Sequence, residues 1–173
     1  KVAREIADFM KNHKGFITEK DLAQYKAIER TPLKGTYREF DIITVPPPSS
    51  GGATLIQLMN IMEQADFDTL EFNSAPYVHF LAESMRRAYA DRARYLGDPD
   101  FNPDIPVDKL MSKEYARIQF QSIDMKKATG SDTSRFVNIS EGDNTTHLSV
   151  IDKDGNAVSL TYTLEYSYGS GLV

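Results

Sequence analysis

The chain has 173 residues, 40% of them hydrophobic and 26% charged, which is the composition of an ordinary globular domain or of a piece of one. Its net charge of -5 argues against a nucleic acid or an anionic membrane as partner, because phosphate binding requires clustered Lys and Arg. No apolar run approaches the roughly 20 residues that span a bilayer. The absence of cysteine excludes disulfides, thiol catalysis and Cys-ligated zinc.

The N-terminal part of the chain predicts two short helices. Apolar residues in 6–10 recur at helical spacing, and this helix is expected to end near Gly15. Thr18, with Asp21 three residues later, has the pattern of a capping box and predicts the start of a second helix.

A strand is predicted next, over Thr36–Val45, because this segment is rich in β-branched and aromatic residues. Pro46–Pro48 is expected to end it, since proline has no N–H for a sheet ladder. Ser49–Gly52 then predicts a capped turn that opens a helix, whose apolar residues run from Leu55 to Met62.

The middle of the chain predicts a longer helix from about Pro76 to Gly97, where Gly-Asp-Pro ends it. Phe101–Val107 is interpreted as a loop, and Lys113–Ser122 as one more short helix. The segment 125–144 is polar and almost without apolar pattern, and loops of that length in compact domains are usually mobile or functional.

Alternating apolar and polar residues on both sides of "DKDGN" predict a β-hairpin. A three-residue loop at 153–155, with its glycine in the left-handed conformation, pairs Asp152 with Asn156. Counting outward along the two strands then places Thr145 opposite Thr163, close enough for their hydroxyls to hydrogen-bond.

A two-residue loop would instead place Leu164 opposite Thr145 and Thr163 opposite Thr146. A simpler interpretation of these threonines is that they are exposed sheet residues, because threonine favours strands. "DKDGN" also suggests a calcium loop, but its glycine comes too early and Thr163 stands in the place of the closing Glu. No metal site is therefore predicted.

Three stretches together resemble the γ-glutamyltranspeptidase family: "LKGTYREFDIITVPPPSSGG", "ESMRRAYADRARYLGDPDF" and "TTHLSVIDKDGNAVSLTYTLEYSYGSGLV". The resemblance covers nearly the whole chain, in the family's order. It implies an α+β fold that is part of the αββα sandwich of N-terminal-nucleophile hydrolases. It also implies a precursor that cuts itself into a large and a small subunit.

Matched onto this sequence, the resemblance makes Thr145 the nucleophile and places the cut between Asn144 and Thr145. Residues 1–124 would then be the end of the large-subunit region, 125–144 the processing loop and 145–173 the start of the small-subunit region. Thr163 matches the family threonine that hydrogen-bonds the nucleophile. Chemistry gives the cut a reason, because it frees an α-amino group that can act as the base for its own hydroxyl.

The resemblance implies transfer of a γ-glutamyl group from glutathione or a related donor to water, an amino acid or a peptide, without a cofactor. Glu165 departs from the family pattern, which has an Asn that contacts the substrate's α-amino group. A carboxylate there could pair with that ammonium. It could equally mark a cephalosporin-acylase-like or polyglutamate-depolymerising enzyme, or Glu165 could be a solvated residue at a strand end.

Several other patterns favour structural roles. His147 lies about 7 Å along the strand from Thr145, too far for a catalytic pair. Ser49–Gly52 lacks the lysine and spacing of a phosphate-binding loop, and Asp98 and Asp100 belong to a helix stop. Asn138 and Asn144 begin glycosylation patterns that are common by chance.

We expect the segment to come from an exported precursor, periplasmic or extracellular, whose targeting signal lies upstream of Lys1. The resemblance places a substrate-clamping arginine upstream, and Ser-Ser and Gly-Gly elements downstream. The partners would be the remainder of its own two subunits, and the segment alone would be inactive. A catalytically incomplete structural module is the non-enzymatic alternative.

Overall fold

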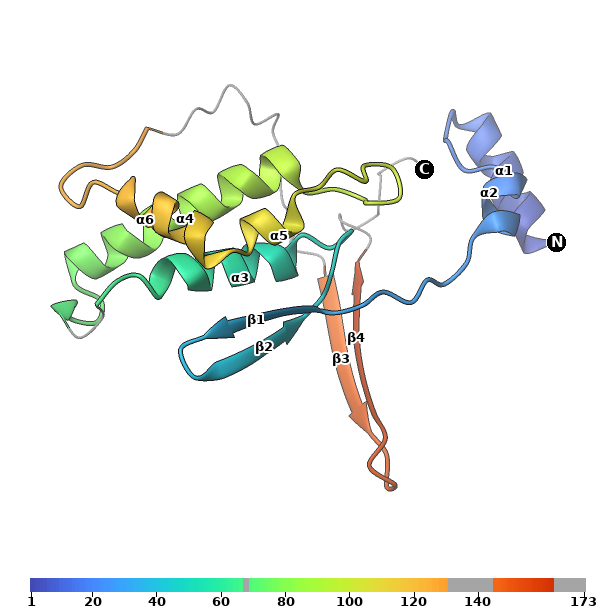
Figure 1. Cartoon of the computed structure of the whole chain (residues 1–173). Helices are drawn as coiled ribbons and strands as arrows, with labels where there is room; N and C mark the ends of the chain where they lie inside the picture. Colours follow the sequence, from blue (N-terminus) through green and yellow to red (C-terminus); the bar gives the residue numbers. More distant parts are fainter. Residues whose placement is uncertain (67–68, 131–144, 164–173) are drawn as a thin grey trace. The chain divides into compact units, whose positions relative to one another are not determined.

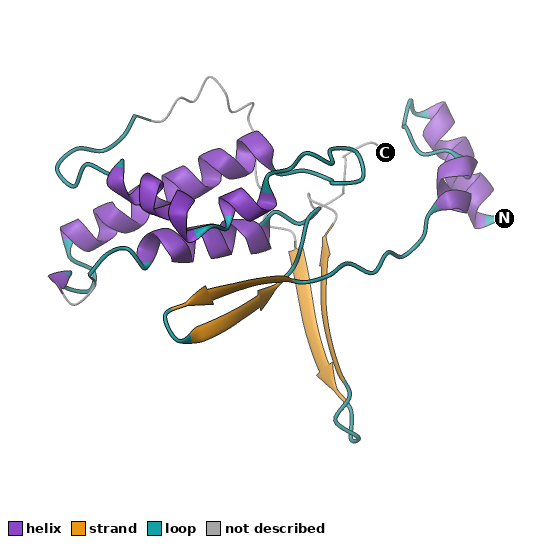
Figure 2. Ribbon diagram, in the orientation of Figure 1, coloured by secondary structure: helices purple, strands orange, loops and turns teal. Residues whose placement is uncertain are grey.

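The computed structural model describes residues 1–66, 69–130 and 145–163. The chain forms two compact units, one of Lys1–Ile28 with Val137–Val173 and one of Glu29–Phe136. Helices and short antiparallel sheets occur together (Figure 2), which confirms the predicted α+β class. In the described part of the chain, no helix has both the length and the apolar character needed to cross a membrane.

The first unit contains the two predicted N-terminal helices, α1 (Val2–Asn12) and α2 (Glu19–Gln24). The predicted capping box is present, because the Asp21 N–H donates to the Thr18 hydroxyl at 3.3 Å and the Thr18 N–H donates to the Asp21 carboxylate at 2.8 Å. Two donors that a helix start leaves unpaired are thereby satisfied.

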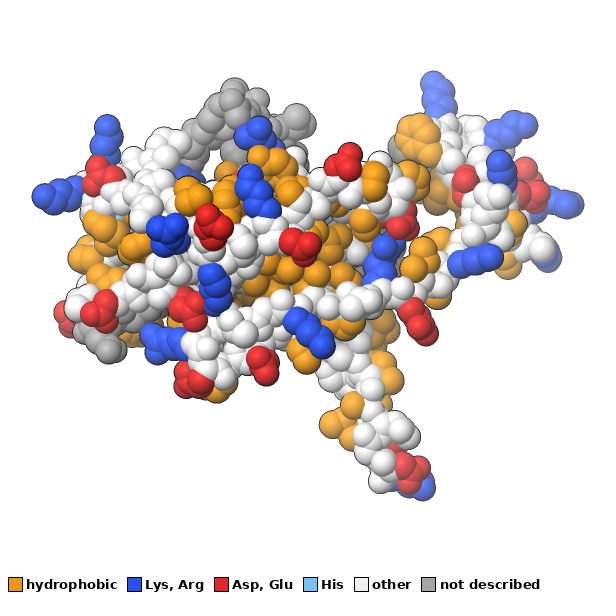
Figure 3. All heavy atoms as spheres, in the orientation of Figure 1, with side chains coloured by type: hydrophobic (Ala, Val, Ile, Leu, Met, Phe, Trp, Pro, Cys, Tyr) orange, Lys and Arg blue, Asp and Glu red, His pale blue; other side chains and the backbone are white. Residues whose placement is uncertain are grey.

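The same unit contains an antiparallel hairpin of β3 (Thr145–Ile151) and β4 (Ala157–Thr163), drawn in orange and red in Figure 1. One of its faces carries apolar side chains that are about half exposed: Leu148, Val150, Val158 and Leu160. Figure 3 shows hydrophobic side chains along the hairpin and charged ones at its turn.

The second unit begins with a hairpin where the sequence predicted one continuous strand over Thr36–Val45, so that prediction is wrong. The strands are β1 (Leu33–Tyr37) and β2 (Phe40–Thr44), which pair antiparallel around Arg38 and Glu39. Arg38 has the left-handed φ of 52° that such a tight turn requires.

Contacts from other elements hold this turn. The Arg38 N–H donates to Glu63 Oε1, and Lys113 pairs with the same carboxylate. Lys113 also donates to the Thr36 carbonyl at 2.8 Å. A left-handed non-glycine residue costs about 1 kcal/mol, and these tertiary contacts offset that cost.

Four helices complete the second unit: α3 (Gly51–Met62), α4 (Ala75–Tyr95), α5 (Val107–Leu110) and α6 (Lys113–Gln121). α3 packs against β1 and against the other three helices (Figure 1). The core consists of the buried residues Ala53, Ile56, Ile61, Phe80, Ala88, Leu110 and Ala116. The short α5 begins at Val107, the last residue of the predicted loop.

Gly52 allows the start of α3 to approach the end of β2. A Cβ on Gly52 would lie 1.9 Å from the Val45 carbonyl oxygen, so a side chain cannot be accommodated there. Ser50 is the N-cap residue, but its hydroxyl makes no capping bond and accepts a hydrogen bond from Arg92 Nε at 2.8 Å. The predicted helix start is confirmed, whereas the predicted capping by serine is wrong.

Candidate active site

The turn of the β3–β4 hairpin is ordered by Asp152. Its carboxylate accepts hydrogen bonds from the Asp154 N–H at 2.9 Å and from both the N–H and the side-chain amide of Asn156. These bonds, with the Asn156 side chain first, lower the pKa of Asp152. Gly155 has a φ of 85°, and its N–H donates to the Asp152 carbonyl. This is the geometry predicted for a three-residue loop.

The loop sets the register of the two strands. Thr145 is the Cα partner of Thr163, and Thr146 is the partner of Tyr162. The prediction that Thr145 lies opposite Thr163 is confirmed. The alternative two-residue loop, which would have put Leu164 opposite Thr145, is excluded.

His147 is bound by hydroxyl groups of its own hairpin. Its Nδ1 lies 2.8 Å from the Thr161 hydroxyl, and its Nε2 lies 3.1 Å from that of Ser149 and 3.2 Å from that of Ser159. Both ring nitrogens of His147 therefore have hydroxyl partners within the hairpin. The arrangement supports the structural role predicted for His147.

Two predicted site residues, Asn144 and Glu165, lie outside the described residues, as does the part of the predicted processing loop from 131 to 144. The boundaries predicted at 124, 144 and 145 refer to precursor cleavage and stay predictions. Within the described ranges, no cluster of His, Asp and Glu could hold a metal ion.

The aspartates that follow α4 have a structural partner. Arg30 Nη2 lies 2.6 Å from the Asp100 carboxylate and 4.0 Å from that of Asp98. Asp98 also accepts the Asp100 N–H at 3.0 Å. The interpretation of these residues as part of a helix stop is supported.

Sequence reasoning missed two buried carboxylates on α4. Asp91 Oδ2 accepts hydrogen bonds from Gln57 Nε2 at 2.6 Å and from the Tyr115 hydroxyl at 3.0 Å, and thus joins α3, α4 and α6. Burial and then the neighbouring Asp91 raise the pKa of Tyr115 to about 12. Both acids lie on the buried face of α4, together with Phe80, Ser84 and Ala88.

Glu83 is the second buried carboxylate, with 1% of its surface exposed. Burial by itself would raise its pKa, but hydrogen bonds from Thr129, Arg87 and Arg86 outweigh that effect and lower the pKa to about 2. Glu83 is therefore ionised and fully paired inside the second unit.

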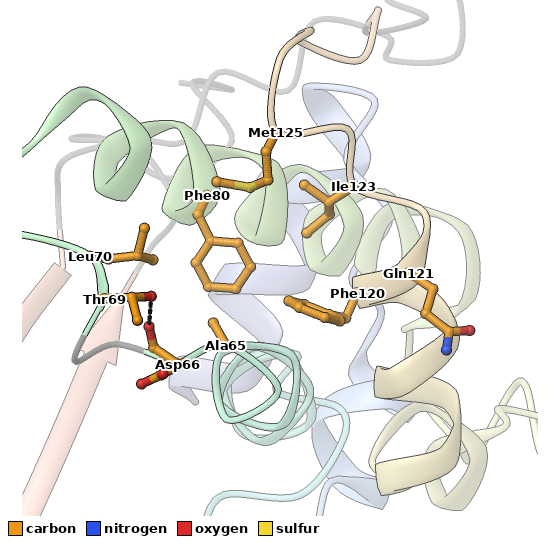
Figure 4. A pocket seen from close by; sticks show the side chains of 9 residues that line it. All are labelled: Ala65, Asp66, Thr69, Leu70, Phe80, Phe120, Gln121, Ile123 and Met125. Atoms are coloured by element: carbon orange, nitrogen blue, oxygen red, sulfur yellow. Dashed lines mark hydrogen bonds between the residues drawn. The ribbon is translucent and has the colours of Figure 1, made fainter.

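Phe80, which precedes Glu83 by three residues on α4, lines a largely apolar pocket of about 370 Å³ (Figure 4). Phe80 and Phe120 meet edge to face in its wall, with ring centroids 5.9 Å apart. Ile123 and Met125, from the segment after α6, line the same pocket.

Known proteins resemble the chain over its whole length. Residues 1–173 match the family described as Gamma-glutamyltranspeptidase. The glutathione hydrolase proenzyme of Escherichia coli is 46% identical, and the Acylase ACY 1 proenzyme of a Pseudomonas species (strain SE83) is 40% identical. The matches cover 99% and 98% of this chain but 30% of each of those proteins.

A solved structure agrees with this match. The crystal structure of Helicobacter pylori gamma-glutamyltranspeptidase superposes with a TM-score of 0.67 at 43% identity, over 83% of this chain and 42% of that one. The chain belongs to the γ-glutamyltranspeptidase family of N-terminal-nucleophile hydrolases and spans about 30% of the length of the curated relatives it matches.

Proposed function

We propose that the chain is the central part of a self-processing γ-glutamyl transferase or hydrolase, with Thr145 as its nucleophile. The observation that carries the proposal is the pairing of Thr145 with Thr163. Directly opposed residues of an antiparallel pair share a face, with Cβ atoms about 5 Å apart. At that separation the two threonine hydroxyls can hydrogen-bond, and Thr163 would then orient the nucleophile.

Self-cleavage would begin at the bond between Asn144 and Thr145. The Thr145 hydroxyl adds to the Asn144 carbonyl carbon, the C–N bond breaks, and an ester forms while the nitrogen becomes a free amine. Water then hydrolyses the ester, which leaves a carboxylate on Asn144 and restores the hydroxyl. The new α-amino group, with an ordinary pKa of about 8, is a base within reach of that hydroxyl.

In the processed enzyme, this amine would take the hydroxyl proton as Thr145 attacks the γ-glutamyl amide carbon of glutathione or a similar donor. The leaving amine departs with a proton, and an acyl-enzyme remains. Water, an amino acid or a peptide then accepts the γ-glutamyl group. Glu165 would contact the α-amino group of the donor, and no metal or cofactor takes part.

The substrate-clamping arginine and the Ser-Ser and Gly-Gly elements implied by the family lie outside Lys1–Val173, so we propose that this segment alone is inactive. Its partners would be the rest of its own large and small subunits. An exported location, periplasmic or extracellular, is part of the same proposal.

The test uses the full-length precursor on a denaturing gel. We expect two fragments, with the smaller beginning Thr145-Thr146-His147 on N-terminal sequencing. Thr145→Ala should leave one uncut and inactive chain, whereas Thr146→Ala should still be cut. An active enzyme that stays in one piece would overturn the proposed mechanism.

A second candidate is an acylase with another donor, and it is favoured by the 40% identity with the Acylase ACY 1 proenzyme. The two functions separate when release of a chromophore from a γ-glutamyl anilide is compared with hydrolysis of a glutaryl-cephalosporin. Preference for the anilide supports the first function, and preference for the cephalosporin supports the second. Glu165→Asn should change that preference.

A further inference from the structure

The chain that leaves α6 runs along α4. Three α4 side chains contact it: His79, Glu83 and Arg87. Residues spaced by four lie on one face of a helix, so these three side chains form a single row. We call this row the α4 clamp and residues 122–129 the clamped segment.

The α4 clamp holds main-chain atoms at three points. His79 Nε2 lies 2.9 Å from the Asp124 carbonyl oxygen, and Arg87 Nη2 donates to the Ser122 carbonyl at 2.7 Å. The Thr129 N–H donates to Glu83 Oε1 at 3.1 Å. Because the contacts reach the backbone, they fix the path of the chain whatever side chains it carries.

The charges of the clamp are buried and paired. Arg87 Nη1 lies 2.8 Å from Glu83 Oε2, and their side chains are 10% and 1% exposed. Arg86 adds a second contact to Glu83 at 3.1 Å. Removing one partner of such a pair leaves an uncompensated buried charge, so the clamp is a strong anchor.

Packing secures the clamped segment between its polar anchor points. Ile123 and Met125 point into the pocket formed with Phe80 and Phe120 (Figure 4). Polar contacts therefore hold the backbone, and apolar contacts hold the side chains between them. Gly130 follows the last anchored residue, Thr129, directly in the sequence.

We propose that His79, Glu83 and Arg87 are positioning residues for self-cleavage, a role that rests on the function proposed above. The clamp fixes the start of the chain that leads from Gly130 to the bond between Asn144 and Thr145. Without it, the last held residue of the described chain before Thr145 would be Gln121 at the end of α6 instead of Thr129, so the chain from that point to Thr145 would be longer. By chain entropy alone, the longer chain brings its end into position about twofold less often.

The test measures the rate of self-cleavage of the full-length precursor, made by cell-free synthesis and sampled on denaturing gels. Thr129→Pro removes the N–H that Glu83 accepts, whereas Thr129→Ala keeps it. We expect cleavage about twofold slower in Thr129→Pro, Glu83→Gln and Arg87→Met. Thr129→Ala should be less affected, and the exposed Arg94→Gln on the same helix should match the parent.

A Gly- and Ser-containing insertion after Gly130, with as many residues as the clamped segment 122–129, measures how much a longer chain alone slows self-cleavage. It lengthens the chain while the clamp stays intact, so we expect the same factor of about two. Once cut, all variants should have the parental kcat, because the clamp acts before the active site exists. A general loss of structure would lower kcat as well.

Amide hydrogen exchange of residues 122–129 reports whether the clamp has opened. Faster exchange together with slower cleavage in Glu83→Gln supports the inference. Faster exchange with parental cleavage rates in Glu83→Gln and Thr129→Pro overturns it, and unchanged protection in every variant overturns the clamp itself. A parent that stays uncut overturns the proposed function and this inference together, whereas normal cleavage of the parent and all variants overturns this inference alone.

Discussion

Thr145 and Thr163 are paired across the β3–β4 ladder, at the end of the hairpin that lies opposite its turn. The register that pairs them is set by the loop at 153–155, where Gly155 has a left-handed backbone. The geometry proposed for the nucleophile is therefore determined by turn residues that take no part in the chemistry.

Gly155→Ala tests this dependence. Nothing lies within 4 Å of the added Cβ, so the cost is conformational only, about 1 kcal/mol for a φ of 85°. We expect faster amide exchange in β3 and β4 and slower self-cleavage of the full-length precursor. Gly97→Ala, which also meets no atom within 4 Å and has no left-handed φ, is the control. Equal behaviour of the two variants would contradict the prediction.

Gly52→Ala should destabilise the second unit strongly. Its Cβ would lie 1.9 Å from the Val45 carbonyl oxygen and 3.0 Å from Thr44 Cγ2, so β2 or α3 must move. We expect a loss of about 3 kcal/mol in the free energy of unfolding, measured by denaturant titration. Gly51→Ala is a matched control, because its Cβ meets only the Ser49 hydroxyl at 3.7 Å. A loss of similar size at both positions would show that close approach is not the cause.

Glu83 should make stability depend on acid pH. Its pKa is 4.5 without perturbation and about 2 in the folded chain, so its contribution is complete above pH 4.5 and disappears as the pH falls towards 2. The shift corresponds to about 3 kcal/mol. Glu83→Gln should lower the free energy of unfolding by about this amount at neutral pH and flatten its change between pH 4.5 and 2.

The control for this titration is the exposed Glu114→Gln on α6. It should keep the parental dependence of stability on acid pH. If Glu83→Gln retains the full parental slope, the carboxylate is not the group that titrates.

Tyr115→Phe should weaken the junction of α3, α4 and α6. The buried Asp91 carboxylate would lose one hydrogen bond of 3.0 Å, at a cost of about 2 kcal/mol in the free energy of unfolding. In the parent, Tyr115 should ionise near pH 12, above ordinary tyrosines, as followed by ultraviolet difference absorbance. Its contribution is complete below pH 10 and is lost as the pH rises through 12.

Tyr25→Phe is the comparison, because Tyr25 is 84% exposed. It should change neither the stability nor the late part of the titration. Persistence of the transition near pH 12 in Tyr115→Phe would assign it to another tyrosine.

The sequence predicted those elements whose signals are local. Thr18 and Asp21 form the expected capping box, and the three-residue loop predicted around the glycine of "DKDGN" has the register that the hairpin adopts. Both predictions rest on interactions within a few residues, where side-chain chemistry decides the backbone conformation.

The predictions failed where distant contacts decide the structure. The turn at Arg38 contains neither glycine nor asparagine, and it depends on Glu63 and Lys113 from other elements. The Ser50 hydroxyl accepts a hydrogen bond from Arg92 instead of capping α3. Glu83 also accepts a hydrogen bond from Thr129, which belongs to a segment whose path along α4 no periodicity reveals. None of these distant contacts has a signal in the local sequence.

The three-residue loop of the hairpin also changes what a mutation at its tip would mean. A shift of pairing by one residue turns every side chain of a strand to the other face. If the hairpin keeps a three-residue loop, deleting one residue from 153–155 moves the pairing by one and places Tyr162 or Leu164 opposite Thr145, although both threonines stay in the gene. A deletion at a solvent-exposed tip that shifts the register in this way would act on the proposed nucleophile as directly as a substitution of Thr163.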